Sequence, residues 1–334
     1  MNEQTSPNPP SNPKEVVASM TRMRRIFYVL PVIALAIPFV ANEYLQFMAN
    51  AILVYSLVTV GFNVVIGNLG QLAFANTAFF GLGAYTTAIL MVYAGMPYML
   101  AVVAAAVVGG LGGFLASVTA LRGIRLYYLA IITLAFGELM RWTYLHADGI
   151  THGSDGLLMP QPSFFGIAME NETVKFYVFL LITVVLIKAT SNLMRSRFGR
   201  AIVAIRDNEA ATASLGIHTA RYIILAFVWS GAVVGVAGAM FAALTERVFP
   251  ESFSLTEVIV HFAMVLVGGT GSIIGSVLGA ITLTALPEYF RQFPGMEELF
   301  FGIVIVCVLL FLPKGLVSLL RRVSPVFNER YYRD

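Results

Sequence analysis

Long apolar segments separated by short polar ones run through most of the chain. This pattern predicts successive membrane-crossing helices, because about 20 apolar residues are needed to span a bilayer as a helix. The predicted segments are Ile26–Ala41, Phe47–Gly67, Gln71–Tyr93, Pro97–Leu121, Leu126–His146, Val174–Leu193, Tyr222–Leu244, Val258–Gly268, Ile273–Tyr289 and Phe300–Leu312. Two of them are short for a bilayer of about 30 Å, so we expect these to be re-entrant or shielded by neighbours. The sequence therefore predicts an all-α, polytopic membrane protein with about 8–10 transmembrane helices and some glycine-broken or re-entrant segments.

The composition agrees with this class. The 334 residues are 58% hydrophobic and only 12% charged, whereas a soluble domain carries about 25% charged residues. A β-barrel is disfavoured because its strands alternate apolar and polar residues over about 10 positions. The basic residues gather at the ends of the apolar segments, so topology explains them better than a nucleic-acid partner does.

The distribution of positive charge predicts the orientation. Most of the 21 Lys and Arg residues lie in segments 1–25, 122–125, 194–221 and 313–334, which share one side if every segment crosses. Cytoplasmic loops carry the excess of Lys and Arg, so both termini are predicted to be cytoplasmic. The expected organisation is a disordered tail over 1–25, a transmembrane domain over 26–312 with a cytoplasmic loop at 195–221, and a second cytoplasmic tail over 313–334. A channel or a secondary transporter would share this plan.

Two glycine-rich stretches interrupt the helical pattern within apolar surroundings, at residues 67–87 and 268–282. Non-helical backbone at membrane depth must be buried in protein or line a watery path. Broken helices in a transporter point to its substrate route. The candidate pathway residues are Asn68, Gln71, Asn76, Thr77, Gly268, Gly269, Thr270 and Gly271. The alternative explanation for these residues is close helix packing and interhelical hydrogen bonding. For Gly109, Gly113, Gly231, Gly235 and Gly238, we expect close helix packing.

Ionisable residues inside the apolar segments are few. Glu138 and Arg141 lie three positions apart in one segment, so they share a helix face and are predicted to form a buried ion pair. A role for this pair in gating or substrate contact is the alternative. His261 lies in an apolar segment and is expected to be a packed histidine whose polar atoms are satisfied, with a role as a ligand as the alternative.

The longest polar insert, residues 195–216, is predicted to contain a short exposed helix. Asp207 or Asn208 can cap its start, and Glu209 in the first turn suits the helix dipole. Ala210 and Ala211 keep the helix slim, and Gly216 is a natural C-terminal stop. One interpretation is an amphipathic helix on the membrane surface. The other is a helix that docks into a cleft of a separate ATPase.

No enzyme signature is present in the sequence. A Walker A motif, a Gly-x-Ser-x-Gly elbow and metal-site spacing of Cys and His are all lacking. We therefore expect no catalytic activity, no metal and no cofactor in this chain, and an energy source that lies elsewhere.

Several motifs together resemble the LivM-type permease subunit of branched-chain amino-acid ABC importers. The segment Glu209-Ala-Ala-x-x-x-x-Gly216 resembles the EAA loop of bacterial ABC importer permeases. The further matches are Ala204-Ile-Arg-Asp-Asn-Glu-Ala, Leu215-Gly-Ile, Arg221-Tyr, Ala226-Phe with Gly235-Val-Ala-Gly-Ala, Gly70-Gln-Leu-Ala-Phe with Ala78-Phe-Phe-Gly-Leu-Gly-Ala-Tyr, Tyr127-Tyr-Leu-Ala-Ile-Ile-Thr-Leu-Ala-Phe and Val267-Gly-Gly-Thr-Gly-Ser. The likeness runs from about Phe47 to Pro313.

The resemblance implies a multi-pass permease of the bacterial inner membrane that transports branched-chain or related hydrophobic amino acids. It implies a LivH-like second permease, two ATP-binding cassette ATPases that use the ATP, and a periplasmic or lipid-anchored binding protein. The ATPase-coupling residues would be Arg206, Asp207, Glu209, Ala210, Ala211 and Gly216.

One departure from the family pattern bears on the substrate. The family commonly has Ser-Leu-Gly-His where this chain has Ala73-Phe-Ala-Asn76, within the first broken region. A permease for urea, amides or other amino acids therefore stays an alternative, as does a self-sufficient secondary transporter.

Overall fold

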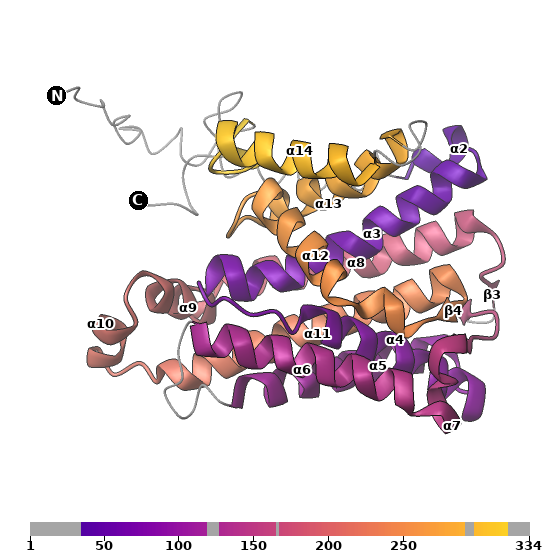
Figure 1. Cartoon of the computed structure of the whole chain (residues 1–334), viewed down its shortest axis with the longest axis horizontal. Coiled ribbons are helices and arrows are strands. Elements are labelled where there is room, and N and C mark those ends of the chain that lie inside the picture. The colour runs from indigo at the N-terminus through magenta and orange to yellow at the C-terminus, as the bar shows by residue number, and fades with distance from the viewer. Residues whose placement is uncertain (1–34, 119–126, 165–166, 291–296, 320–334) are drawn as a thin grey trace.

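Long helices run roughly along one direction and make up most of the molecule (Figure 1). The protein is seen here in a computed structural model that describes residues 35–118, 127–164, 167–290 and 297–319. The helices of this part of the chain are α2 (Ile37–Val40), α3 (Glu43–Asn63), α4 (Asn76–Tyr93), α5 (Tyr98–Ser117), α6 (Tyr127–His146), α7 (Asp148–Thr151), α8 (Glu172–Arg195), α9 (Arg197–Asp207), α10 (Glu209–Ser214), α11 (Thr219–Thr245), α12 (Leu255–Gly268), α13 (Ile273–Phe290) and α14 (Glu297–Phe311). The all-α prediction is confirmed.

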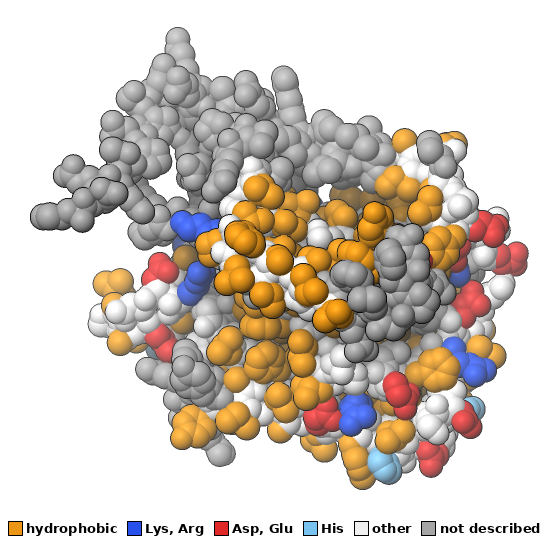
Figure 2. Space-filling model, turned by 45° about the horizontal axis from the view of Figure 1, so that its top comes forward, with side chains coloured by type: hydrophobic (Ala, Val, Ile, Leu, Met, Phe, Trp, Pro, Cys, Tyr) orange, Lys and Arg blue, Asp and Glu red, His pale blue; other side chains and the backbone are white. Residues whose placement is uncertain are grey.

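Five helical segments are long and apolar enough to cross a membrane, as judged by length and composition of the described residues. They are α3 with its extension to Asn68, α5, α8, α11 and α13. Helix α12 is apolar but has only 14 residues, which gives a length of about 21 Å. It is therefore too short to span the hydrocarbon layer alone, as its sequence predicted. Figure 2 shows hydrophobic side chains over the middle of one face, with most charged side chains toward its edges.

The two ends of the bundle differ. At one end, here called the α7 end, lie α7, the 3-10 turns η3 (Gly153–Asp155) and η4 (Pro250–Phe253), and two small antiparallel ribbons. The ribbons pair β1 (Leu157–Leu158) with β4 (Arg247–Val248), and β2 (Ser163–Phe164) with β3 (Ile167–Ala168). At the opposite end, here called the α9 end, α9 and α10 project from the bundle (Figure 1).

Helix α11 is the centre of the bundle and packs against α3, α4 and α5. Small residues let these backbones approach closely, as the sequence predicted. A Cβ added to Gly83 of α4 would lie 1.9 Å from the carbonyl oxygen of Gly235, and one added to Gly109 of α5 would lie 2.3 Å from that of Gly231. The main hydrophobic core surrounds these contacts. Helices α12 and α13 contribute a separate small cluster that includes Ala263, Met264, Val267 and Leu283.

Most predicted segments correspond to helices within a few residues, with one informative difference. The third segment was predicted as helix from Gln71, but α4 begins only at Asn76. The five preceding residues are irregular, so the gap between the second and third predicted segments extends well beyond residues 68–70. The tail 1–25, most of segment 26–41, the loop 122–125 and the chain beyond residue 319 lie outside the described residues.

Candidate functional site

The first break lies at the α9 end of α3. There α3 continues into a π-helix, η1 (Val64–Asn68), in which the amide of Leu69 donates to the carbonyl of Val64 at 3.1 Å. Gly70 follows with φ +74°, a conformation that costs glycine little because it has no Cβ. The chain then runs irregularly to the start of α4. Single π-turns of this kind occur frequently at functional sites.

The second break separates α12 from α13. Gly269 and Gly271 adopt φ values of +123° and +76°, which side chains rarely allow. Gly269 is also crowded, because an added Cβ would lie 2.7 Å from Val317 and 3.0 Å from the carbonyl oxygen of Lys314. The amide of Leu316 donates to the carbonyl of Val267 at 2.8 Å. The segment after α14 therefore covers the end of α12.

The two breaks touch each other through Asn63. Its side-chain oxygen accepts from the amide of Gly271 at 2.8 Å, and its amide nitrogen donates to the carbonyl of Ser272 at 3.0 Å and to Ser276 Oγ at 2.7 Å. Gly67 lies beside this junction, since an added Cβ would be 2.2 Å from the nitrogen of Gly271. The sequence analysis did not single out Asn63. The sequence feature that could have identified Asn63 is an amide side chain one helical turn before Gly67 in an otherwise apolar helix.

Helix α9 contacts the first break directly. Arg206 Nη1 donates to the carbonyl oxygen of Gly67 at 2.6 Å. The stem of the same side chain covers Gly70, where an added Cβ would lie 2.6 Å from Arg206 Cγ. A carbonyl released by the π-helix is thus satisfied by a cation from the projecting helix pair, and charge-assisted bonds of this kind are strong.

Helices α9 and α10 are joined by side-chain hydrogen bonds and are called here the α9–α10 unit. Asn208 caps α10, as predicted, by accepting from the amide of Ala211 at 3.0 Å. Thr212 Oγ1 donates to the carbonyl of Ala204 in α9 at 2.9 Å. Gly216 ends the unit with φ +82° and has no atom near the position of a Cβ. These two bonds hold α10 against the end of α9.

The unit has an apolar face and an exposed face. Ala201, Ile202 and Ile205 form the apolar face of α9 and are buried. Of the residues proposed from the sequence for ATPase coupling, Glu209 is half-buried and the rest are exposed: Arg206, Asp207, Ala210, Ala211 and Gly216. All of them lie at the α9 end, where the slim alanine surface of α10 is open to a partner.

The predicted pathway residues are all at or near the breaks, but they fall into two groups. Asn68 lies at the junction, where it donates to the carbonyl of Asn63 at 3.2 Å, together with Gly268, Gly269, Thr270 and Gly271. The other group, Gln71, Asn76 and Thr77, is buried on the way to the start of α4. In this second group Asn76 Nδ2 lies 3.2 Å from His261 Nδ1 of α12.

Two expectations about ionisable residues require correction. Glu138 and Arg141 form the predicted ion pair at 3.0 Å, but each side chain is 39% exposed, so the prediction of a buried pair is wrong. The reason is that α6 turns a different face, with Leu129, Thr133 and Gly137, toward α4. His261 is fully buried as expected, yet its Nε2 has no hydrogen-bond partner.

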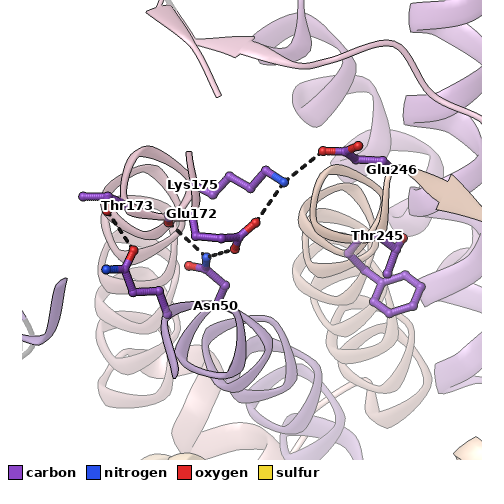
Figure 3. A network of polar contacts seen from close by, with 8 residues as sticks. Asn50, Glu172, Thr173, Lys175, Thr245 and Glu246 are labelled. Atoms are coloured by element: carbon purple, nitrogen blue, oxygen red, sulfur yellow. Dashed lines mark hydrogen bonds and ion pairs between the residues drawn. The ribbon is translucent and has the colours of Figure 1, made fainter. Parts of the chain in front are cut away.

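A charged network that the sequence analysis missed lies near the α7 end (Figure 3). The side chain of Lys175 is only 4% exposed and is 3.1 Å from Glu172 Oε1 and 3.0 Å from Glu246 Oε1. Asn50 Nδ2 donates to Glu172 Oε2 at 2.7 Å. These contacts connect the starts of α3 and α8 with the end of α11. Glu246 holds a left-handed conformation, φ +58°, which allows the chain to turn into β4.

Comparisons with known proteins identify one matching family and several relatives of this chain. The family model described as branched-chain amino acid transport system / permease component matches residues 44–310. The permease protein LivM of a high-affinity branched-chain amino acid transport system from Salmonella typhimurium is 33% identical, over 93% of this chain and 80% of the relative. BraD from Pseudomonas aeruginosa is 28% identical, over 83% and 96%. LivH from Escherichia coli is 25% identical, over 82% and 96%. No solved structure matches.

The Lys175 network predicts a sharp contrast between two charge removals. We expect Lys175→Met to destabilise the solubilised protein by about 3 kcal/mol, because it leaves carboxylates near a buried site without their cation. Arg141→Gln removes one partner of an exposed ion pair and should lower the stability of the solubilised protein by less than about 1 kcal/mol. Thermal unfolding in detergent measures both variants. Equal shifts in melting temperature for the two would contradict the difference in burial.

Proposed function

The chain belongs to the family of branched-chain amino acid transport system permease components, and on this premise we propose that it is the membrane subunit of an ABC importer for branched-chain or related hydrophobic amino acids. It is a multi-pass membrane protein, and its family is one of transport components and not of enzymes. The observation that carries the proposal is the bond between Arg206 of the exposed α9–α10 unit and the carbonyl of Gly67 in the first break. This bond joins a surface suited to a soluble partner to the broken backbone in the bundle.

The proposed partners follow from the exposed unit and from the relatives. Relatives named LivM and LivH are both permease proteins of branched-chain systems, which supports a pore made with a LivH-like second permease. Two ATP-binding cassette ATPases would bind at the α9–α10 units and use the ATP, so this chain itself would hold no nucleotide, metal or other cofactor. A periplasmic or lipid-anchored binding protein would deliver the amino acid at the α7 end.

The proposed mechanism is alternating access driven through α10. Closure of the ATPases would shift the α9–α10 unit, which moves as one body because Asn208 and Thr212 hold it together. Arg206 would pass this shift to Gly67 in the first break. Asn63, hydrogen-bonded across to Gly271 and Ser272, would pass it to the second break and so to α12 and α13. Both breaks would then rearrange together.

Variants of the coupling surface test this route. We expect Glu209→Lys and Gly216→Leu to lower ATP-dependent leucine uptake at least tenfold while the protein still inserts at normal levels. Gly216 is open, so a side chain there alters the docking surface and strains the backbone by about 1–2 kcal/mol. Gly95→Leu is the matched control, since Gly95 has φ +59° and open space in the α4–α5 loop at the other end. Unchanged uptake in both coupling variants would reject the role of the surface.

The proposed orientation in the bacterial inner membrane places the α9 end and both termini in the cytoplasm. Leu215 is 81% exposed beside Gly216, and Cys307 is the single cysteine. A Leu215→Cys, Cys307→Ser protein should react with a membrane-impermeant maleimide in inside-out vesicles and not in intact cells. Bound ATPase subunits should protect it. Labelling of intact cells would show that this end is exterior and would exclude the importer mechanism.

A further inference from the structure

Helix α4 begins deep inside the bundle. Its first residues, Asn76, Thr77 and Ala78, are each 1% exposed, and no side chain caps the helix. The irregular segment before it is held at this depth by Thr133 of α6, whose Oγ1 accepts from the amide of Phe74 at 2.9 Å. The first-turn amides of an α-helix have no partners within the helix and carry partial positive charge. An 18-residue helix therefore points its positive end into a buried place.

A second, independent feature lies at the same place. Asn76 and His261 form a hydrogen bond of 3.2 Å, yet Asn76 Oδ1 and His261 Nε2 are buried without partners. If Asn76 donates to His261 Nδ1, then Nε2 carries the proton and is an unused donor. If the amide is turned over, its NH₂ group becomes the unused donor and Nε2 the unused acceptor. In either arrangement one donor and one acceptor are unsatisfied, and a buried polar group without a partner is destabilising.

The surroundings suit a hydrophobic side chain. The rings of Tyr55 and Phe80 lie 5.7 Å and 5.8 Å from the His261 ring, between centroids. Phe241 and Phe253 pack around Phe80 at 5.0 Å and 5.6 Å. The place thus combines an uncapped helix start, an unused donor and acceptor, and aromatic side chains packed against His261. These are the complementary groups for a zwitterion with an aliphatic side chain.

We propose that the N-terminus of α4, with Asn76 and His261, binds the carboxylate of the transported amino acid inside the permease. This proposal rests on the proposed function and identifies the part of the permease that contacts the transported amino acid. The first-turn amides and the unused donor bind the carboxylate, while Tyr55 and Phe80 contact the aliphatic part. His261 is fully buried here, so α12 closes the site. Movement of α12, which ends at the second break, opens it.

The test measures leucine uptake and ATP hydrolysis together in proteoliposomes that contain the complete complex, with binding protein supplied outside. Asn76→Asp places a negative charge where the substrate carboxylate binds. His261→Phe keeps a ring and removes both nitrogens, and His261→Gln keeps an amide donor. Thr87→Val is the matched control, because Thr87 is fully buried in α4 and its hydroxyl bonds only within the helix, to Gly83.

We expect Asn76→Asp and His261→Phe to lower uptake at least tenfold, while ATP hydrolysis stimulated by the loaded binding protein stays within twofold. His261→Gln should keep at least a third of the uptake, and Thr87→Val should equal the wild type. Wild-type uptake in the first two variants would overturn the site. So would equal defects in His261→Phe and His261→Gln, or parallel loss of uptake and hydrolysis, since these indicate packing. Failure of the wild-type complex to import leucine with ATP would instead reject the proposed function.

Discussion

The structure depends on one constraint, which is that backbone groups released where helices break inside an apolar bundle must find partners within the protein. Each break meets this constraint through a distant segment. The carbonyl of Gly67 accepts from Arg206 of α9, the amide of Gly271 donates to Asn63 of α3, and the amide of Phe74 donates to Thr133 of α6. Satisfying the breaks therefore also ties them to each other and to the exposed helix pair.

The remaining packing divides the described chain into a tight frame and a second part with its own small core. In the frame, α4, α5 and α11 approach so closely at their glycines that no side chain would fit between backbones. Close-packed contacts of this kind resist deformation. Helices α12 and α13 have their own small core and join the frame mainly through α3. Motion between these two parts would change the breaks and the buried pair of Asn76 and His261 while leaving the frame intact.

Local features were predictable from the sequence, and contacts between distant segments were not. The caps of α10, the stop at Gly216 and the glycine packing follow from residue types and short spacings. By contrast, Asn63 and Gly271 are 208 positions apart, and nothing in either neighbourhood indicates that they meet. The same limit explains one error and one omission. The exposure of Glu138 and Arg141 depends on which face of α6 meets α4, and the burial of Lys175 depends on where α11 ends.

The most direct test of this account is the number of leucine molecules imported per ATP hydrolysed when Arg206 is changed. Arg200 provides the control, because it lies on the same helix and donates to a backbone carbonyl away from the breaks, that of Arg195 at 3.3 Å. In the reconstituted complex, Arg206→Gln should retain ATP hydrolysis but lower the import ratio at least tenfold, and Arg200→Gln should keep the wild-type ratio. A wild-type ratio in Arg206→Gln would contradict the claim that the bond to Gly67 transmits the movement.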